Sequence, residues 1–330
     1  MENLLRSVTS PDVDVSSEIF SFIGKKEFMF VMSLTCTWFF DMTNLMRRTA
    51  EFKWKHFGGF PGGFPGPFSL ECMGLALHRF PNLCIVEMIA GLTSPELNEI
   101  SRFIFPSLPS LVKLCLDNNH LTTLPDSIGA LTGLKKLDLN NNHFTTLPDS
   151  IGALTGLTTL SLGDNHLTTL PDSIGALTNL KELWLDNNQL TTLPDSIGTL
   201  VGLKTLMLCD NRITTLPDSI GALTGLTHLH LDHNQLTALP ESIGALTGLT
   251  LLYLHSNQLT ALPESIVALT NLGHLSLLDN PPLIPSAQSA AVQAWLQALE
   301  DSPACNLRCD DFTLRSTRGD SRACSRCAIG

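Results

Sequence analysis

Apolar positions return with a period of 23 residues over residues 111–280. Each of eight copies begins L-x-x-L-x-L-x-x-N, with leucine at its first, fourth and sixth positions, and five of them continue with x-L. The first copy carries this pattern on Leu111, Leu114, Leu116, Asn119 and Leu121. A single copy is too short to bury its own leucines, so successive copies must stack on one another. The pattern predicts a solenoid in which each head segment is a short strand, and the strands form one parallel sheet.

Asparagine occupies the ninth position of every copy. The series is Asn119, Asn142, Asn165, Asn188, Asn211, Asn234, Asn257 and Asn280. An inward amide at a bend can pair with backbone groups of neighbouring turns that would otherwise be buried without partners. We therefore expect a structural role for all eight.

The second half of each copy reads L-P-x-S-I-G, with small variations. Pro125 and its equivalents fix φ, and we expect Gly129 and its equivalents to permit a turn. An acid follows the proline in seven copies, at Asp126, Asp149, Asp172, Asp195, Asp218, Glu241 and Glu264. Single carboxylates one repeat apart do not surround a cation, so this row is interpreted as a solvated edge.

These motifs resemble the leucine-rich repeat family, in its 23-residue form with L-P-x-S-I-G. The resemblance implies an α/β repeat fold with the parallel sheet on the concave face and a protein ligand bound there. We expect eight repeats over 111–280, preceded by a linker and degenerate capping repeat over 58–110. Residues 281–300 are expected to form a C-terminal cap, with a helix over 286–299. The remaining segment, 301–330, is a cysteine-containing tail.

Residues 1–57 carry short apolar patterns at helical spacing, which predict a small helical module. The run E-I-F-S-F-I-G-K-K-E-F-M-F-V-M-S-L-T-C-T-W, followed by F-K-W-K-H-F, resembles the F-box, although Val15-Ser16 replaces its Leu-Pro and Cys36 stands where a basic residue is common. This resemblance implies docking on a Skp-type adaptor protein. The contact residues would be Ile19, Phe22, Ile23, Phe28, Leu34 and Trp38. The alternative is that these helices only cap the first repeat.

Outward strand positions vary between copies while the return half hardly changes. Variation against a repeated background is typical of a ligand-binding face, although neutral drift of exposed positions after duplication would also produce it. The candidate partner-binding residues are Glu182, Trp184, Met207, His228, His230, Leu251, Tyr253 and His274. Exposed aromatic and methionine side chains are frequent in binding hot spots.

Two groups of residues suggest metal chemistry. His228, His230, His233, His255 and His274 gather in three repeats and could form a zinc site or a pH-sensitive patch, but no cysteine supports them and strand spacing separates the rings. In the tail, two cysteine pairs could hold one zinc ion, against the alternative of a disordered segment. These pairs are Cys305 with Cys309 and Cys324 with Cys327.

The formal charge of −11 lies mainly in the repeats, where 15 acidic residues face 6 basic ones, and this disfavours nucleic acid as a partner. Residues 1–14 do not resemble a secretory leader, and the apolar stretch 27–40 is too short to cross a membrane. We expect a cytoplasmic or nuclear protein with reduced cysteines and no membrane contact.

Motifs for enzymatic chemistry are missing from the repeats, which contain no G-x-S-x-G and no P-loop. The leading hypothesis is a non-enzymatic substrate-recognition adaptor of a cullin-type ubiquitin ligase, without a cofactor in the repeats. The alternative is a leucine-rich repeat scaffold with no role in ubiquitination, and an enzyme ranks third.

Overall fold

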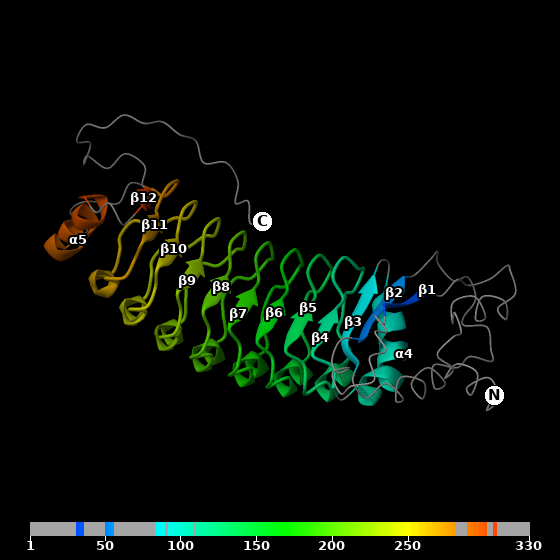
Figure 1. Cartoon of the computed structure of the whole chain (residues 1–330). Coiled ribbons are helices and arrows are strands. Elements are labelled where there is room, and N and C mark those ends of the chain that lie inside the picture. Colours follow the sequence, from blue (N-terminus) through cyan, green and yellow to red (C-terminus); the bar gives the residue numbers. More distant parts are fainter. Residues whose placement is uncertain are drawn as a thin grey trace, which may run out of the picture.

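The strands of the repeats lie side by side along one face of an elongated array (Figure 1). The structure is a computed structural model that describes residues 31–35, 50–55, 83–89, 92–108, 110–281, 289–301 and 306–308. Each repeat contributes three residues to the sheet. These strands are β4 (Lys113–Cys115), β5 (Lys136–Asp138), β6 (Thr159–Ser161), β7 (Glu182–Trp184), β8 (Thr205–Met207), β9 (His228–His230), β10 (Leu251–Tyr253) and β11 (His274–Ser276). All eight are parallel, which confirms the predicted solenoid.

On the opposite side, seven repeats return through a 3₁₀ turn. These turns are η2 (Asp126–Ala130), η3 (Asp149–Ala153), η4 (Asp172–Ala176), η5 (Asp195–Thr199), η6 (Asp218–Ala222), η7 (Glu241–Ala245) and η8 (Glu264–Ala268). Pro125 precedes η2 with φ −71° and ψ 147°, so the chain enters the turn from an extended conformation. Ile128 N then donates to Pro125 O at 3.0 Å, and Leu131 N donates to Ile128 O at 3.0 Å. The recurring acid is the first residue of each turn.

Glycine in these turns lies in close contact with the next turn, in addition to its expected role of permitting the turn itself. A Cβ at Gly129 would lie 3.1 Å from Ser150 O of the next turn, and one at Gly221 would lie 2.5 Å from Ser242 O. Neither glycine has a positive φ. The last turn carries Val267 instead, which packs against the core near the C-terminal cap.

The core is a continuous column of leucine and isoleucine side chains, most of them fully buried. The asparagine series lies at the edge of this core, as Asn188 illustrates. Its Nδ2 donates to Leu162 O at 2.9 Å and to Leu185 O at 3.1 Å, while its Oδ1 accepts from Leu167 N at 2.9 Å. The same bonds recur along the array, so each amide joins its own repeat to the one before it, as expected from the sequence.

The residue just before each of these asparagines adopts a left-handed conformation, with φ between 52° and 56°. The set is Asn118, Asn141, Asp164, Asn187, Asp210, His233, Ser256 and Asp279. Asparagine and aspartate tolerate this region better than most residues, which explains their prevalence here. The exceptions are His233 in the sixth repeat and Ser256 in the seventh.

At its N-terminal end the array is extended by β3 (Leu83–Ile89), α4 (Ser94–Ile104) and η1 (Phe105–Ser107). Strand β3 pairs in parallel with β4, with Val86 in register with Leu114. The degenerate capping repeat over 58–110 stays a prediction. Helix α4 was not predicted. It begins with Thr93 N donating to Glu96 Oε2 at 2.8 Å, and it buries Leu97 in the core.

Two segments of the N-terminal module form strands where helices were expected. β1 (Val31–Thr35) pairs antiparallel with β2 (Ala50–Lys55), and β2 pairs in parallel with β3. The helical expectation is therefore wrong at these residues, which include Leu34. Pairing with the open edge of β3 satisfies backbone groups that a helix would pair internally. The other proposed adaptor contacts, Ile19, Phe22, Ile23, Phe28 and Trp38, lie outside the described residues.

Helix α5 (Ala290–Asp301) covers the other end of the core and buries Val292 and Leu296 (Figure 1). This confirms the predicted C-terminal cap. β12 (Asn306–Arg308) then pairs in parallel with β11, so this short part of the tail is an added strand rather than a disordered segment. The tail cysteines, Cys305, Cys309, Cys324 and Cys327, lie outside the described residues. Among the helices that are described, none is both long enough and apolar enough to cross a membrane.

Candidate functional site

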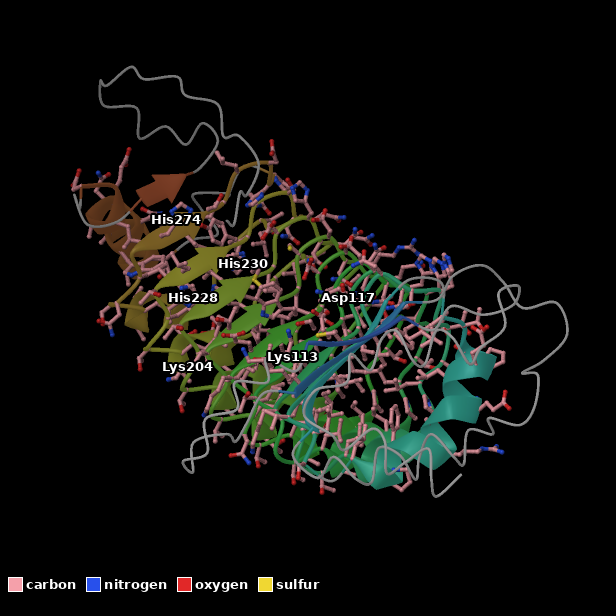
Figure 2. All side chains as sticks on the ribbon, turned by 45° about the vertical axis from the view of Figure 1, so that its right-hand side comes forward. Lys113, Asp117, Lys204, His228, His230 and His274 are labelled. Atoms are coloured by element: carbon pink, nitrogen blue, oxygen red, sulfur yellow. The ribbon has the colours of Figure 1, made fainter. Side chains whose placement is uncertain are left out.

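The candidate partner-binding residues form two adjoining rows across neighbouring strands. In the first row Trp184 pairs with Met207, Met207 with His230, and His230 with Tyr253. The second row holds Glu182, Thr205, His228, Leu251 and His274 in register. Figure 2 shows His228, His230 and His274 on strands toward the C-terminal end of the array, with Lys113 and Asp117 toward its other end. We call the eight residues predicted from the sequence the strand-face patch.

Ring contacts hold the C-terminal half of this patch together. His230 stacks on Tyr253 with ring centroids 4.6 Å apart, and Tyr253 lies 4.6 Å from His274 in a tilted arrangement. Thr227 Oγ1 lies 2.8 Å from His228 Nδ1, within hydrogen-bonding distance. All members are half-buried, so each ring presents part of its surface to solvent. The patch is a supported, partly exposed aromatic surface.

Small buried residues flank the patch on the same row. Ser161 on β6 and Ser276 on β11 occupy the positions next to Trp184 and Tyr253, and both are buried. In this row the large partly exposed side chains are thus confined to β7–β10, whereas the second row continues to His274 on β11. Acidic groups lie beyond the strand ends, where burial raises the pKa of Asp186 and the charges of Asp164 and Asp210 raise it further.

Burial lowers the pKa of His230 to about 4 from its ordinary value of 6.5, and the neighbouring His228, His255 and His274 lower it further when charged. The folded protein therefore holds this imidazole neutral at pH values where the unfolded chain protonates it. The stability that it contributes is fully present above about pH 6.5 and is lost as the pH falls toward 4.

We expect His230→Met, which introduces the residue found at the equivalent position of β8, to remove this pH dependence. Between pH 7 and pH 4 the wild type should lose about 2 kcal/mol more free energy of unfolding than the variant. Urea denaturation at a series of pH values measures the difference. Parallel pH profiles for the two proteins would contradict the expectation.

A second cluster lies where β9 and β10 end. Asp232, His233 and His255 each offer one ligand atom, and these three atoms lie within 4.8 Å of one another. His255 Nε2 is 3.6 Å from Asp232 Oδ2, and the rings of His233 and His255 meet edge to face at 5.1 Å. Burial raises the pKa of Asp232, while His255 opposes that shift. We call these three residues the strand-end cluster.

Sequence reasoning grouped the histidines of this region but missed Asp232. The signal was available, because Asp232 and His255 are 23 residues apart and so occupy the same position in consecutive repeats. Stacking places such residues side by side. Of the other three histidines of the group, His230 and His274 contact the ring of Tyr253, and His228 lies within hydrogen-bonding distance of Thr227. None of the three belongs to the cluster.

Three further histidines form a separate exposed column at the N-terminal end of the array. His120 stacks on His143 at 5.7 Å, and His143 stacks on His166 at 5.5 Å. They occupy the position after the structural asparagine in three consecutive repeats. Within the described residues, this column does not belong to a group of three metal-ligand atoms as compact as the strand-end cluster.

Two family models match the array. Residues 69–192 match a model described as a leucine-rich repeat region, and residues 178–236 and 224–281 match one described as a leucine rich repeat. A comparison with curated proteins gave no match.

Solved structures with this architecture match about two thirds of the chain. A leucine-rich repeat protein of Leptospira interrogans is 38% identical over 63% of this chain and 52% of its own, with a TM-score of 0.58. The TLR13–ssRNA13 complex is 28% identical over 66% of this chain and 35% of its own, with a TM-score of 0.55. A third structure is the ectodomain of GASSHO1/SCHENGEN3, a membrane receptor kinase of Arabidopsis thaliana, in complex with CASPARIAN STRIP INTEGRITY FACTOR 2. It is 26% identical over 63% of this chain and 31% of its own, with a TM-score of 0.52. The chain thus spans about half or less of the length of these structures.

Proposed function

Because the chain is a leucine-rich repeat protein, we propose that it is a non-enzymatic binding scaffold whose strand-face patch takes a protein ligand. The observation that carries this proposal is the in-register run of Trp184, Met207, His230 and Tyr253 over four consecutive strands. Large, partly exposed side chains of this kind on a rigid sheet can bury apolar surface against a partner without first losing much conformational freedom.

The charge distribution favours a protein over a nucleic acid as the ligand. One structural relative binds ssRNA, but the repeats here carry 15 acidic residues against 6 basic ones. Such an array repels a phosphate backbone. Glu182 within the patch and Asp186 beyond it would instead favour a ligand segment that combines an apolar anchor with a lysine or arginine.

An adaptor role in a ubiquitin ligase rests on the resemblance of residues 1–57 to the F-box alone. Leu34, one of the expected contacts, lies in β1, which pairs with β2 and extends the sheet of the repeats. The described residues therefore favour a module that continues the solenoid, so we propose a scaffold without a ligase link. A Skp-type protein that bound the full chain, and lost binding with Trp38→Ala, would reverse this choice.

Substitution of the patch tests the scaffold function. Proteins captured by cross-linking to the wild-type chain are purified, and their dissociation constants are measured against Trp184→Ala, Tyr253→Ala and the control Val201→Ala. Val201 is an apolar residue with 56% of its surface exposed and lies outside the patch. Loss of a central aromatic anchor should weaken binding by about 30-fold or more, equivalent to about 2 kcal/mol.

The control distinguishes this proposal from a general effect of exposed apolar surface. Val201→Ala should leave the dissociation constant within about twofold of the wild-type value, because rim or remote contacts contribute little. If every captured protein binds the patch variants as tightly as the wild type, the strand-face patch is not the binding site.

A further inference from the structure

The strand-end cluster combines three ligand types that suit one metal ion. Two imidazoles and one carboxylate are the donor set of many three-coordinate protein sites for Zn²⁺, with the fourth position left to water. Hard cations such as Mg²⁺ and Ca²⁺ prefer oxygen ligands alone. The chemistry of the cluster therefore selects a divalent transition metal.

Buried atoms without partners provide a second, independent observation. Asp232 is 7% exposed, and its Oδ1 makes no hydrogen bond with the described residues. Nδ1 of His255 is also buried without a partner. A buried carboxylate oxygen without a hydrogen bond is costly in a folded protein unless something else binds it. A metal ion held by Asp232 would neutralise the charge of this buried carboxylate and so reduce that cost.

The distances fit an ion after a small adjustment. Zinc–ligand bonds of about 2.1 Å place two tetrahedral ligands about 3.4 Å apart. His255 Nε2 and Asp232 Oδ2, at 3.6 Å, are close to this separation and too far apart for a good hydrogen bond. His233 is exposed, so its ring has room to rotate and close the remaining gap.

Among the eight repeats, this combination of residues occurs only where the sixth repeat meets the seventh. The position of Asp232 is filled by His255 in the next repeat and elsewhere by aspartate, asparagine, glycine, cysteine or leucine. The position of His233 is filled elsewhere by asparagine, aspartate or serine. Asparagine and aspartate are favoured at the left-handed φ of 53° that His233 adopts. In the sixth repeat a histidine takes this position, directly after Asp232, whose carboxylate lies 3.6 Å from His255 Nε2.

We propose that Asp232, His233 and His255 form a binding site for a divalent transition-metal ion, for which Zn²⁺ is the test ion. The site lies beside the strand-face patch, because His255 also contacts the ring of Tyr253 edge to face at 6.2 Å. It is separate from the tail cysteines, and it does not depend on the scaffold function, since metal affinity can be measured without any protein ligand.

Three substitutions test the site with residues that the fold already accepts. Asp232→Asn, His233→Asn and His255→Asp each introduce the side chain found at the equivalent position of another repeat. All variants are made in the full chain with the tail thiols removed, so that these cannot contribute. The background carries Cys305→Ser, Cys309→Ser, Cys324→Ser and Cys327→Ser. Zn²⁺ binding is measured by equilibrium dialysis and calorimetry.

The parent should bind one equivalent of Zn²⁺. Asp232→Asn and His233→Asn should each weaken binding by more than about 100-fold, because loss of a direct ligand costs more than the 10–100-fold typical of its hydrogen-bond partners. His255→Asp keeps a ligand atom but shortens its reach, so its loss should be smaller. The Co²⁺-loaded parent should lack thiolate-to-metal absorption, which excludes the half-buried Cys209 as a ligand.

His143→Gln provides the matched control. His143 belongs to the exposed histidine column, and glutamine is the residue at the equivalent position of three other repeats. Its affinity for Zn²⁺ should equal that of the parent, and circular dichroism should show that all variants are folded. A parent that binds no Zn²⁺, or an affinity unchanged by Asp232→Asn and His233→Asn, would show that the cluster is only an ion pair.

Discussion

Gly221→Ala is expected to lower the free energy of unfolding by about 3 kcal/mol, which corresponds to a fall of roughly 6–12 °C in Tm. The new Cβ would lie 2.5 Å from Ser242 O and 2.8 Å from Ser242 Cβ of the next turn. Both contacts are shorter than the van der Waals radii allow, so η6 and η7 must separate. Separation of two turns also loosens the leucine layers behind them.

Gly129→Ala is the matched control, because the same substitution meets the looser contact of 3.1 Å with Ser150 O. There the steric cost is partly offset by the lower entropy of alanine in the unfolded chain, worth about 0.4–1 kcal/mol. We expect a net change within about 1 kcal/mol. Thermal and urea denaturation of both variants measure the contrast. Equal losses at the two positions would show that close packing of the turns is not why glycine is required.

The second large effect is expected for Asn188→Ala, at about 3 kcal/mol. The substitution leaves Leu167 N buried without its partner, and such an orphan costs about 1–3 kcal/mol. It also removes the bond from Asn188 Nδ2 to Leu162 O, which keeps only the bond from Asn165 Nδ2 at 3.1 Å. The loss should appear as weaker coupling between the third and fourth repeats, since the amide bonds to both. Hydrogen exchange of the Leu167 amide should become faster than in the wild type.

Asn179→Ala controls for the loss of any asparagine. Its amide is exposed and makes one bond, from Nδ2 to Thr155 O at 2.8 Å. Because water can replace that bond, we expect a loss below about 1 kcal/mol. The explanation fails if the buried and exposed substitutions destabilise the protein by the same amount.

The sequence was most informative where a pattern recurs. Inward leucines and the asparagine series follow from period and residue type, because any other arrangement would bury unpaired backbone groups or expose the leucines. The outward row from Trp184 to Tyr253 also follows, since the register of stacked copies is set by the repeat length. These features are local or repeat at fixed spacing, so a single chain contains enough comparisons to identify them.

The features that were not predicted depend on contacts with other segments of the chain, which one segment's own pattern does not show. The apolar residues of Val31–Thr35 have spacings compatible with either a helix or a strand. The segment forms a strand because it pairs with β2, which in turn pairs with the edge of β3. The sequence predicts a role for Gly221 only in its own turn, although the contact that a Cβ would make there comes from Ser242 in the next repeat. Asp232 was passed over because its importance lies in its neighbour, His255, and not in its own repeat.

Val267 has a consequence for how such an array can grow. If the seventh repeat were copied directly after itself, this valine would face the serine of the new turn, at a position where a Cβ in the earlier turns would lie 2.4–3.1 Å from the serine oxygen. Duplication of an interior repeat meets no such obstacle, since the glycine is copied with it. The array can therefore lengthen from within but not at this terminus, and its end is specified by the volume of one side chain beneath α5.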